Sequence, residues 1–219
     1  MKIIVILISL LFSISFGDDK LPNDIRWVTG SGEYKSLCEQ TYHLAWQKVK
    51  ESVDTDIGNL AIVMDLDETV MDNSQYQVEI TGKGESFSMD SWTAWVNRGE
   101  AGLVPGVGAF IDSVRSLGNV RIVFISNRMA DRTDVTRKNL QDLSAAGNSD
   151  IYLLRKDRGD KKNVRRKEIF TGNGRMEAYG SYTVIAWFGD AMGDFPSETM
   201  NSNFGESWFM LPNPMYGKW

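Results

Sequence analysis

The sequence predicts an α/β fold built on a parallel sheet. Five short apolar runs, each ending in polar residues, recur along the chain. Their apolar residues are continuous rather than alternating, which indicates strands buried on both faces. Helical patterns lie between several of these runs, and that alternation is typical of right-handed crossover units. The chain has 219 residues, which is enough for one domain with its own hydrophobic core.

The expected elements can be placed by residue number. Segment 31–53 has apolar residues at helical spacing, and Ser31 followed by Glu33 and Tyr34 marks its start, so we expect an amphipathic helix packed on the main domain. Strands are predicted at 60–67, 120–128, 150–157, 182–190 and 207–213. Further helices are predicted at 106–117, 132–147 and 163–170.

One connection differs from the others. The segment between Asp67 and Pro105 is rich in Trp, Gly and polar residues and is too long for a simple turn. We therefore predict a cap insertion at about 73–104, next to the carboxyl end of the first strand.

The N-terminus has the pattern of a secretory signal. Lys2 gives a positive start, an apolar stretch follows, and Ser15 and Gly17 are small residues three positions and one position before the expected cut. The apolar stretch is shorter than the roughly 20 residues that a membrane-spanning helix needs. We expect residues 1–17 to be removed and residues 18–219 to form the mature domain. No cysteine lies directly after the apolar stretch at the expected cut, so no lipid anchor is expected, and the predicted location is periplasmic or secreted.

Charge and composition exclude several classes of function. The net charge is −5 and the basic runs are short, so a nucleic acid polymer is not an expected partner. Cys38 is the only cysteine, which rules out an internal disulfide, and we expect it to be a small buried hydrophobe. His43, the only histidine, falls in the first long helix and is expected to be structural.

Chemically active side chains follow the predicted strands. In open parallel sheets, ligands bind beyond the carboxyl ends of the strands. The residues found there are Asp65 and Asp67 after the first strand, Ser126 at the end of the second, Lys161 and Lys162 after the third, and Asp190 and Asp194 after the fourth. Carboxylates, a hydroxyl and a lysine that converge on one point are the groups of a magnesium-dependent phosphoryl-transfer site.

The roles follow from the charge of a phosphate monoester. A carboxylate attacks an anionic phosphate only when the charge is neutralised, and Mg²⁺ held by Asp65 and Asp190 would do this with oxygen ligands. Asp65 can then attack phosphorus as the nucleophile. Asp67 can protonate the leaving oxygen and later activate water. Ser126 and a lysine would bind the phosphoryl oxygens.

Other interpretations of the acidic run are weaker. Two aspartates one residue apart are often a solvated turn. A calcium loop would need glycine where Val70 stands and a closing glutamate, and both are missing. Neither a GxSxG nucleophile elbow nor a P-loop is present.

These motifs resemble those of a known family. DLDETVMDNS (65–74), the strand ending SNR, the later lysine and GDAMGDF (189–195) resemble the four motifs of the haloacid dehalogenase (HAD) superfamily, and in particular the bacterial class C acid phosphatases. The similarity runs from about Trp27 to Trp219 and includes SWTAWV and LVPG in the insertion and FMLPNPMYGKW at the end. It implies a Rossmann-like HAD core with a small cap, one Mg²⁺ and hydrolysis of phosphomonoesters such as 5′-nucleotides, nicotinamide mononucleotide and aryl phosphates.

The resemblance also assigns roles by position. The lysine is Lys162 rather than Lys161, because the family pattern of Lys, two residues and Arg fits Lys162 to Arg165. The other positions are Asp65 (nucleophile and metal), Asp67 (acid/base, and metal through its backbone carbonyl), Ser126 (phosphate), Asp190 (metal), Asp194 (the second acid of the last motif), and Trp92 and Tyr216 (aromatics that sandwich a nucleotide base).

The chain also departs from the family. Ala191 stands where Asn is usual, and TGNGRMEAYG (171–180) looks like an insertion between the lysine and the last motif. A phosphotransferase that uses an alcohol in place of water fits the same residues, as does a non-catalytic protein that kept the fold for binding or storage. A homodimer is compatible with the sequence.

Overall fold

The fold is described from a computed structural model, which defines residues 21–56, 58–196 and 203–217. The predicted signal peptide, residues 1–17, lies outside these ranges.

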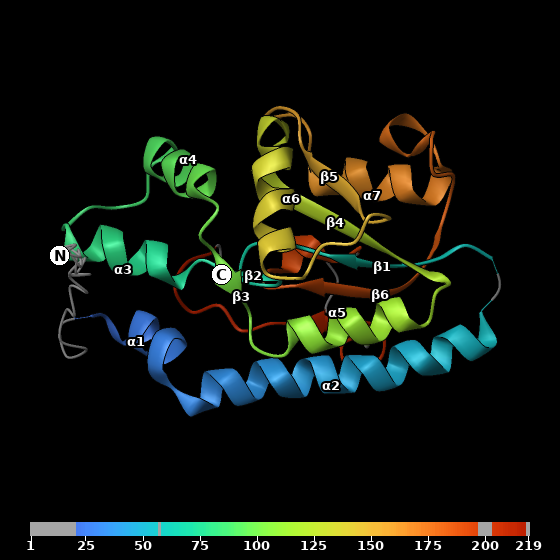
Figure 1. The fold of residues 1–219 in the computed structure, drawn as a ribbon, viewed down its shortest axis with the longest axis horizontal. Coiled ribbons are helices and arrows are strands. Elements are labelled where there is room, and N and C mark those ends of the chain that lie inside the picture. The colour runs from blue at the N-terminus through green and yellow to red at the C-terminus, as the bar shows by residue number, and fades with distance from the viewer. Residues whose placement is uncertain (1–20, 57, 197–202, 218–219) are drawn as a thin grey trace, which may run out of the picture.

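A five-stranded parallel sheet forms the centre of the molecule (Figure 1). Its order is β5-β4-β1-β6-β7, and every neighbouring pair is parallel. The strands are β1 (Leu60–Met64), β4 (Val120–Met129), β5 (Ile151–Arg155), β6 (Thr183–Gly189) and β7 (Trp208–Met210). All five residues of β1 are buried, as expected for a central strand covered on both faces. The predicted parallel sheet is thus confirmed.

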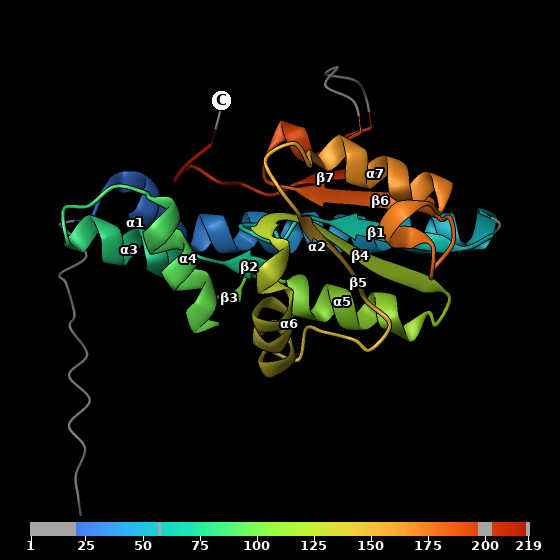
Figure 2. The ribbon, with the colours of Figure 1, turned by 90° about the horizontal axis from the view of Figure 1, so that it is seen from above.

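Helices cover both faces of this sheet. On one face lie α2 (Gly32–Thr55), α5 (Val107–Ser116) and α6 (Thr133–Asp142), and on the other lies α7 (Lys162–Thr171) (Figure 2). Alternate residues of β1 divide between the two cores, with Ile62 on the α2 side and Val63 on the α7 side. Among the described residues, short 3₁₀ turns follow β4 (η2, Ala130–Arg132), α7 (η3, Gly174–Met176) and β6 (η4, Met192–Asp194).

The long connection after β1 forms a small helical cap beside the sheet (Figure 1). Two short antiparallel strands, β2 (Met71–Asp72) and β3 (Gly102–Leu103), pair at its base. Between them lie α3 (Ser74–Gly82) and α4 (Met89–Arg98). A capping box of Ser88 and Ser91 begins α4, and Gly99 ends it in the left-handed conformation, which glycine adopts without steric cost.

The N-terminal region holds one helix more than the sequence pattern predicts. Helix α1 (Asn23–Gly30) occupies what reads as a polar stretch, and it buries only Ile25 and Val28 in the protein. Two turns give too few apolar positions for a clear periodicity. The next helix begins as predicted, because the Ser31 side chain accepts a hydrogen bond from the Tyr34 amide.

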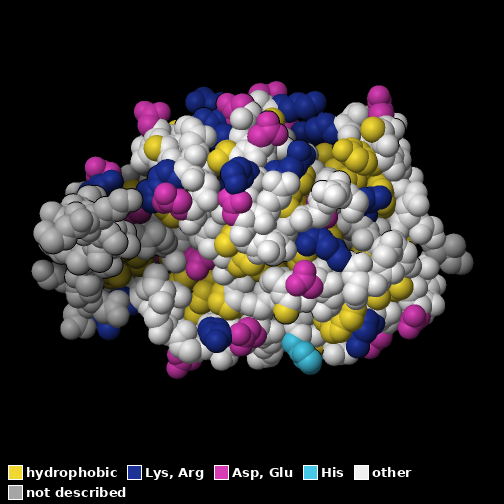
Figure 3. All heavy atoms as spheres, viewed as in Figure 1, with side chains coloured by type: hydrophobic (Ala, Val, Ile, Leu, Met, Phe, Trp, Pro, Cys, Tyr) yellow, Lys and Arg dark blue, Asp and Glu magenta, His cyan; other side chains and the backbone are white. Residues whose placement is uncertain are grey.

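The surface carries both charge signs. On the face shown in Figure 3, basic and acidic side chains are interspersed, and no large field of one sign covers it. Among the described residues, no helix is both long enough and apolar enough to cross a bilayer.

Helix α2 is tied directly to the loop that follows β1. The buried Tyr42 hydroxyl donates a 2.5 Å hydrogen bond to the Thr69 carbonyl, and its ring stacks on Phe188 with centroids 5.9 Å apart. The long helix therefore supports the backbone of the acidic loop as well as one face of the sheet.

Tyr42→Phe should lower the free energy of unfolding by about 1–3 kcal/mol, because the ring stays packed while the buried Thr69 carbonyl loses its side-chain donor. Urea unfolding of the two proteins measures this difference. His43→Gln, at an exposed position of the same helix, is the control and should stay within about 0.5 kcal/mol of the parent. Equal stability of Tyr42→Phe and the parent would show that the hydrogen bond is not stabilising.

Candidate active site

The parallel sheet brings the predicted site residues to one edge. Asp65 directly follows β1 and Asp190 directly follows β6, and these strands are neighbours in register. The Asp65 amide donates to the Phe188 carbonyl at 2.9 Å, which continues the ladder past the end of β1. Ser126 lies in the second half of β4, on the other side of β1.

Three carboxylates meet at this edge. One oxygen from each of Asp65, Asp190 and Asp194 lies within 4.8 Å of the others. The Lys162 ammonium lies 2.5 Å from Oδ1 of Asp65 and 2.5 Å from Oδ1 of Asp194. Lys161 is exposed and holds the N-cap position of α7, so of the two neighbouring lysines it is Lys162 that contacts the acidic cluster.

Burial and repulsion raise the carboxyl pKa values here. Burial raises the pKa of Asp65 well above its ordinary range, against the lowering effect of Lys162. Burial and then the Asp194 charge raise the pKa of Asp190 to about 7. For Lys162, burial alone would lower the pKa, but the Asp65 and Asp194 carboxylates raise it above the ordinary value. These buried, crowded carboxyls therefore resist ionisation unless more positive charge than that of Lys162 is present, and an oxygen-only donor set of this kind fits a hard divalent cation.

A glycine allows the last motif to fold back onto the cluster. A Cβ on Gly189 would lie 2.3 Å from Cβ of Asp194, a separation that no side chain tolerates. The 3₁₀ turn η4 then brings Asp194 Oδ2 within 3.1 Å of the Ala191 amide, which donates to it. The sequence GDAMGD therefore places two acids of one short loop on the same point.

Asp67 is held by three side chains. Its Oδ1 accepts hydrogen bonds from Arg128 Nε at 2.9 Å and from Asn73 Nδ2 at 3.0 Å. Its Oδ2 accepts a longer one, 3.4 Å, from the Ser126 hydroxyl. Oδ1 is thus occupied by strong donors, while Oδ2 has the weaker contact. This arrangement leaves Oδ2 as the oxygen better able to exchange a proton with another group.

The turn after Asp67 is built on buried polar groups. Glu68 has a φ of +56°. Its buried carboxylate accepts a 2.9 Å hydrogen bond from the backbone N–H of Asn73. The Asn73 carbonyl oxygen, Oδ1, in turn accepts from Trp95 Nε1 at 2.8 Å and from Arg128 at 3.2 Å. Asn73 therefore joins the acidic loop, the cap and β4.

Sequence reasoning assigned no role to Arg128, Asn73 or Asn213. All three residues lie inside motifs that carry the family resemblance, but their contacts depend on how the loops fold. Asn213, in the segment after β7, donates a 2.8 Å hydrogen bond to Oδ2 of Asp190. The C-terminal segment is thereby bound to the acidic cluster.

The two predicted base-binding aromatics lie in different segments. Trp92 is on α4, half-buried, with an edge contact to Tyr76 at 5.2 Å and the Arg128 guanidinium 5.7 Å from its ring centroid. Tyr216 is half-buried in the segment after β7. Among the described residues, no ring contact joins Trp92 and Tyr216, so their pairing around a base stays a prediction.

Comparisons with known proteins agree with this geometry. A family model described as HAD superfamily, subfamily IIIB (acid phosphatase), matches residues 17–219. The class C acid phosphatase from Bacillus anthracis is 31% identical, with a TM-score of 0.77, and the match covers 91% of this chain and 86% of that one. The structure of that protein with tungstate bound matches equally well.

Plant proteins are also similar. The stem 28 kDa glycoprotein of Glycine max is 28% identical over 183 residues, or 83% of this chain and 67% of that protein. A stem 31 kDa glycoprotein of the same species is 28% identical, and the match covers 58% of its length. This chain thus spans about two thirds or less of these plant relatives. On the family match and the bacterial structures, the chain belongs to subfamily IIIB of the HAD superfamily and is a class C acid phosphatase, a phosphomonoester hydrolase.

Proposed function

We propose that the protein is an exported, Mg²⁺-dependent acid phosphatase that works through a phosphoenzyme on Asp65. The observation that carries this proposal is the position of Lys162. Its ammonium bonds Asp65 and Asp194 beside the third carboxylate, Asp190, so a nucleophile, a phosphate-binding cation and metal-ligating oxygens share one small volume.

The residues present fit a magnesium ion. Asp65, the Asp67 carbonyl and Asp190 would hold it, and Asp194 would support them as a further acid of the cluster. When bound, Mg²⁺ screens the anionic phosphate from the carboxylates and stabilises charge in the transition state. Asn213 already donates to one oxygen of Asp190 and so orients that carboxylate.

Each protein group then has a separate task. Ser126 and Lys162 bind the phosphoryl oxygens and hold phosphorus in line with Asp65. Asp65 forms a bond to phosphorus as the bond to the leaving oxygen breaks, and Asp67 supplies the proton to that oxygen. Asp67 then takes a proton from water as the water attacks the aspartyl-phosphate, which frees Asp65 and releases inorganic phosphate. Arg128 and Asn73 keep Asp67 oriented through both steps.

The substrates proposed are small phosphomonoesters: 5′-nucleotides, nicotinamide mononucleotide and aryl phosphates. Trp92 and Tyr216 would stack on a base or ring, and such stacking tolerates many bases because each has a π-face. We propose a periplasmic or secreted location without a lipid anchor, on the basis of the N-terminal pattern. A homodimer is part of the proposal and would show as twice the monomer mass in solution.

Asp65→Asn should reduce phosphate release by roughly 10⁴-fold or more, since the nucleophile is lost while the side-chain size is kept. The measurement is inorganic phosphate released from 5′-AMP, nicotinamide mononucleotide and an aryl phosphate, with Mg²⁺ and with EDTA. Asp112→Asn, an exposed acid on α5, is the charge-matched control and should keep full activity. Turnover by Asp65→Asn, or parent turnover that EDTA leaves unchanged, would contradict the mechanism.

Asp190→Asn should stabilise the metal-free protein and remove its response to Mg²⁺. Because the folded-state pKa of Asp190 is raised from the ordinary 3.8 to about 7, the cost to stability grows between about pH 4 and pH 7 and is complete above pH 7. We expect Tm in EDTA to rise by about 2–4 °C at pH 8, corresponding to roughly 1 kcal/mol, and to change little at pH 4. Mg²⁺ should raise Tm of the parent and leave Tm of the variant unchanged. A variant that Mg²⁺ stabilises as strongly as the parent would show that Asp190 is not a ligand.

Trp92→Ala should raise KM for 5′-AMP by roughly tenfold or more while KM for an aryl phosphate changes less, because stacking on a base contributes about 1–3 kcal/mol. Steady-state kinetics with both substrates measure the difference. Trp92→Phe keeps an aromatic face and should recover most of the loss. Equal losses with both substrates would mean that Trp92 serves only to pack against Tyr76.

A further inference from the structure

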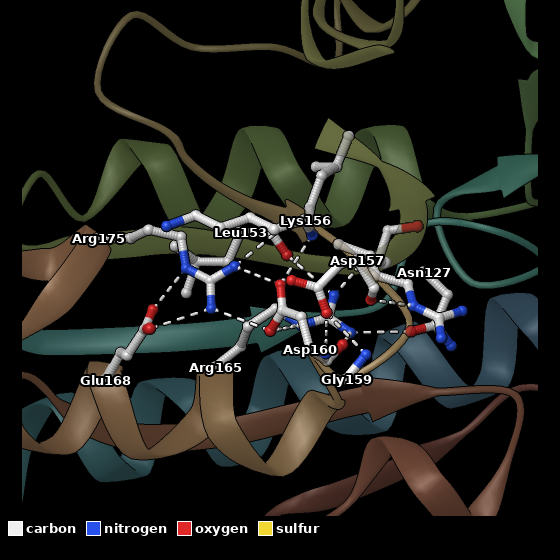
Figure 4. Close-up of polar contacts among 12 residues, drawn as sticks. Asn127, Leu153, Lys156, Asp157, Gly159, Asp160, Arg165, Glu168 and Arg175 are labelled. Carbon is white, nitrogen blue, oxygen red and sulfur yellow. Dashed lines mark hydrogen bonds and ion pairs between the residues drawn. The ribbon is translucent and has the colours of Figure 1, made fainter. Parts of the chain in front are cut away.

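The segment 171–180, which looks like an insertion relative to the family, lies directly after α7. Gly172 ends that helix in the left-handed conformation, and the turn η3 follows. Met176 is fully buried in the core on the α7 side of the sheet, which fixes the segment to the domain. Its one basic side chain, Arg175, is turned back toward the loop between β5 and α7 (Figure 4).

Arg175 binds two carboxylates at once. It donates to both oxygens of Asp160, at 2.7 and 3.1 Å, and to both oxygens of Glu168, at 2.6 and 3.0 Å. A further bond of 3.2 Å reaches the Leu154 carbonyl at the end of β5. The side chain is 15% exposed, so these charge-assisted, two-pronged contacts are largely shielded from water. Asp160 is thereby fixed in position and orientation.

Glycine in the inserted segment makes room for this arrangement. Gly174 has a φ of +61°, and a Cβ there would lie 3.0 Å from Oε1 of Glu168. A larger residue would push the Glu168 carboxylate away from Arg175. The sequence G-N-G-R thus lets the inserted segment approach α7 closely enough for Arg175 to reach both acids.

Asp160, held by Arg175, in turn lies beside Arg165 and restrains it. The Arg165 side chain is completely buried. Arg165 Nε lies 3.5 Å from Oδ1 of Asp160 and has no hydrogen-bond partner among the described residues, so Asp160 supplies its nearest negative charge. The two terminal nitrogens of Arg165 bond four oxygens that lie around them (Figure 4). These are the carbonyls of Ser126, Leu153 and Asp160 and the side chain of Asn127.

Both groups proposed to bind phosphate depend on this network. Arg165 donates a hydrogen bond to the Ser126 carbonyl, and this bond restrains the backbone that carries the Ser126 hydroxyl. Lys162 follows Asp160 by two residues, and Asp160 also anchors the start of their loop by accepting a 2.8 Å bond from the Lys156 amide. Movement of Asp160 would therefore shift the Ser126 carbonyl and the first turn of α7 together.

We propose that Arg175 is a positioning residue for the phosphoryl group: acting through Asp160, it sets the distance between Ser126 and Lys162. This inference rests on the proposed function, because it takes Ser126 and Lys162 as the phosphate-binding pair. Arg175 itself does not touch the reacting atoms. Its loss weakens binding of the phosphoryl group in every substrate, whatever the leaving group.

The test compares Arg175→Gln and Arg175→Lys with the parent, and with Lys167→Gln, which removes the same charge from an exposed position of α7. Supporting shells of this kind are worth roughly 10–100-fold, and a displacement of about 1 Å can cost 10²-fold. We expect kcat/KM of Arg175→Gln to fall by roughly 10–100-fold, equally for 5′-AMP and an aryl phosphate. The inhibition constant of inorganic phosphate should rise in parallel, with Arg175→Lys in between and Lys167→Gln unchanged.

Further variants separate positioning from folding. All assays are run well below the Tm of each variant, and activity is expressed per folded molecule. If Arg175 acts through Asp160, the two substitutions should not add. The double variant Asp160→Asn/Arg175→Gln should then have a kcat/KM no lower than that of the less active single variant. Should Arg175→Gln fail to fold, Glu168→Gln loosens Arg175 more gently and should shift phosphate inhibition in the same direction. Normal kinetics and normal phosphate inhibition in a variant with lowered Tm would overturn the proposal.

Ser126→Ala and Lys162→Gln identify which proposal has failed. If these two lose activity and phosphate affinity while Arg175→Gln keeps both, the positioning role is wrong and the proposed function stands. If Ser126→Ala and Lys162→Gln keep full activity, the phosphate-binding assignment itself is wrong, and the inference about Arg175 falls with it.

Discussion

Like charges crowded at the end of a buried sheet dominate this structure. Asp65, Asp190 and Asp194 converge with Lys162 in a region where burial already disfavours ionised carboxylates. Such a cluster is costly without cations. A fold keeps it only when surrounding elements hold the acids against their repulsion, and parallel strands do this because their carboxyl ends share one edge. The backbone bond from Asp65 to Phe188 is the first of these restraints.

Arginine side chains provide the next restraints. These arginines bind residues that surround the cluster of Asp65, Asp190 and Asp194. Arg128 binds Asp67 and Asn73, and Arg165 binds the carbonyls around Ser126. Both guanidinium groups are almost completely buried. The guanidinium group holds five donors in a fixed planar arrangement, whereas an ammonium carries three rotatable donors on a flexible stem. The rigid scaffold therefore uses arginine, while the group in the acidic cluster itself is a lysine.

The sequence was most informative where local pattern and chemistry coincide. The apolar runs predicted all five strands of the main sheet, and the strand ends predicted that Asp65 and Asp190 lie together. The family pattern, rather than the strand ends, selected Lys162 over Lys161. It was least informative about side chains whose roles depend on distant partners. Asn73 joins residues up to 55 positions away, and Asn213 reaches Asp190 from beyond β7. No spacing rule contains such contacts, and α1 is too short for periodicity to reveal it.

The segment 171–180 shows how a stretch of chain outside the catalytic motifs can become part of a site's framework. A buried Asp160 needs cationic partners, because its carboxylate has been removed from water. Arg165 cannot serve alone, since its terminal nitrogens are already bonded to carbonyls around β4 and β5. Arg175, in the segment 171–180, completes the neutralisation of Asp160. Once Asp160 depends on it, the segment constrains the residues that face the phosphate, although it lies far from the cap that would recognise the rest of the substrate.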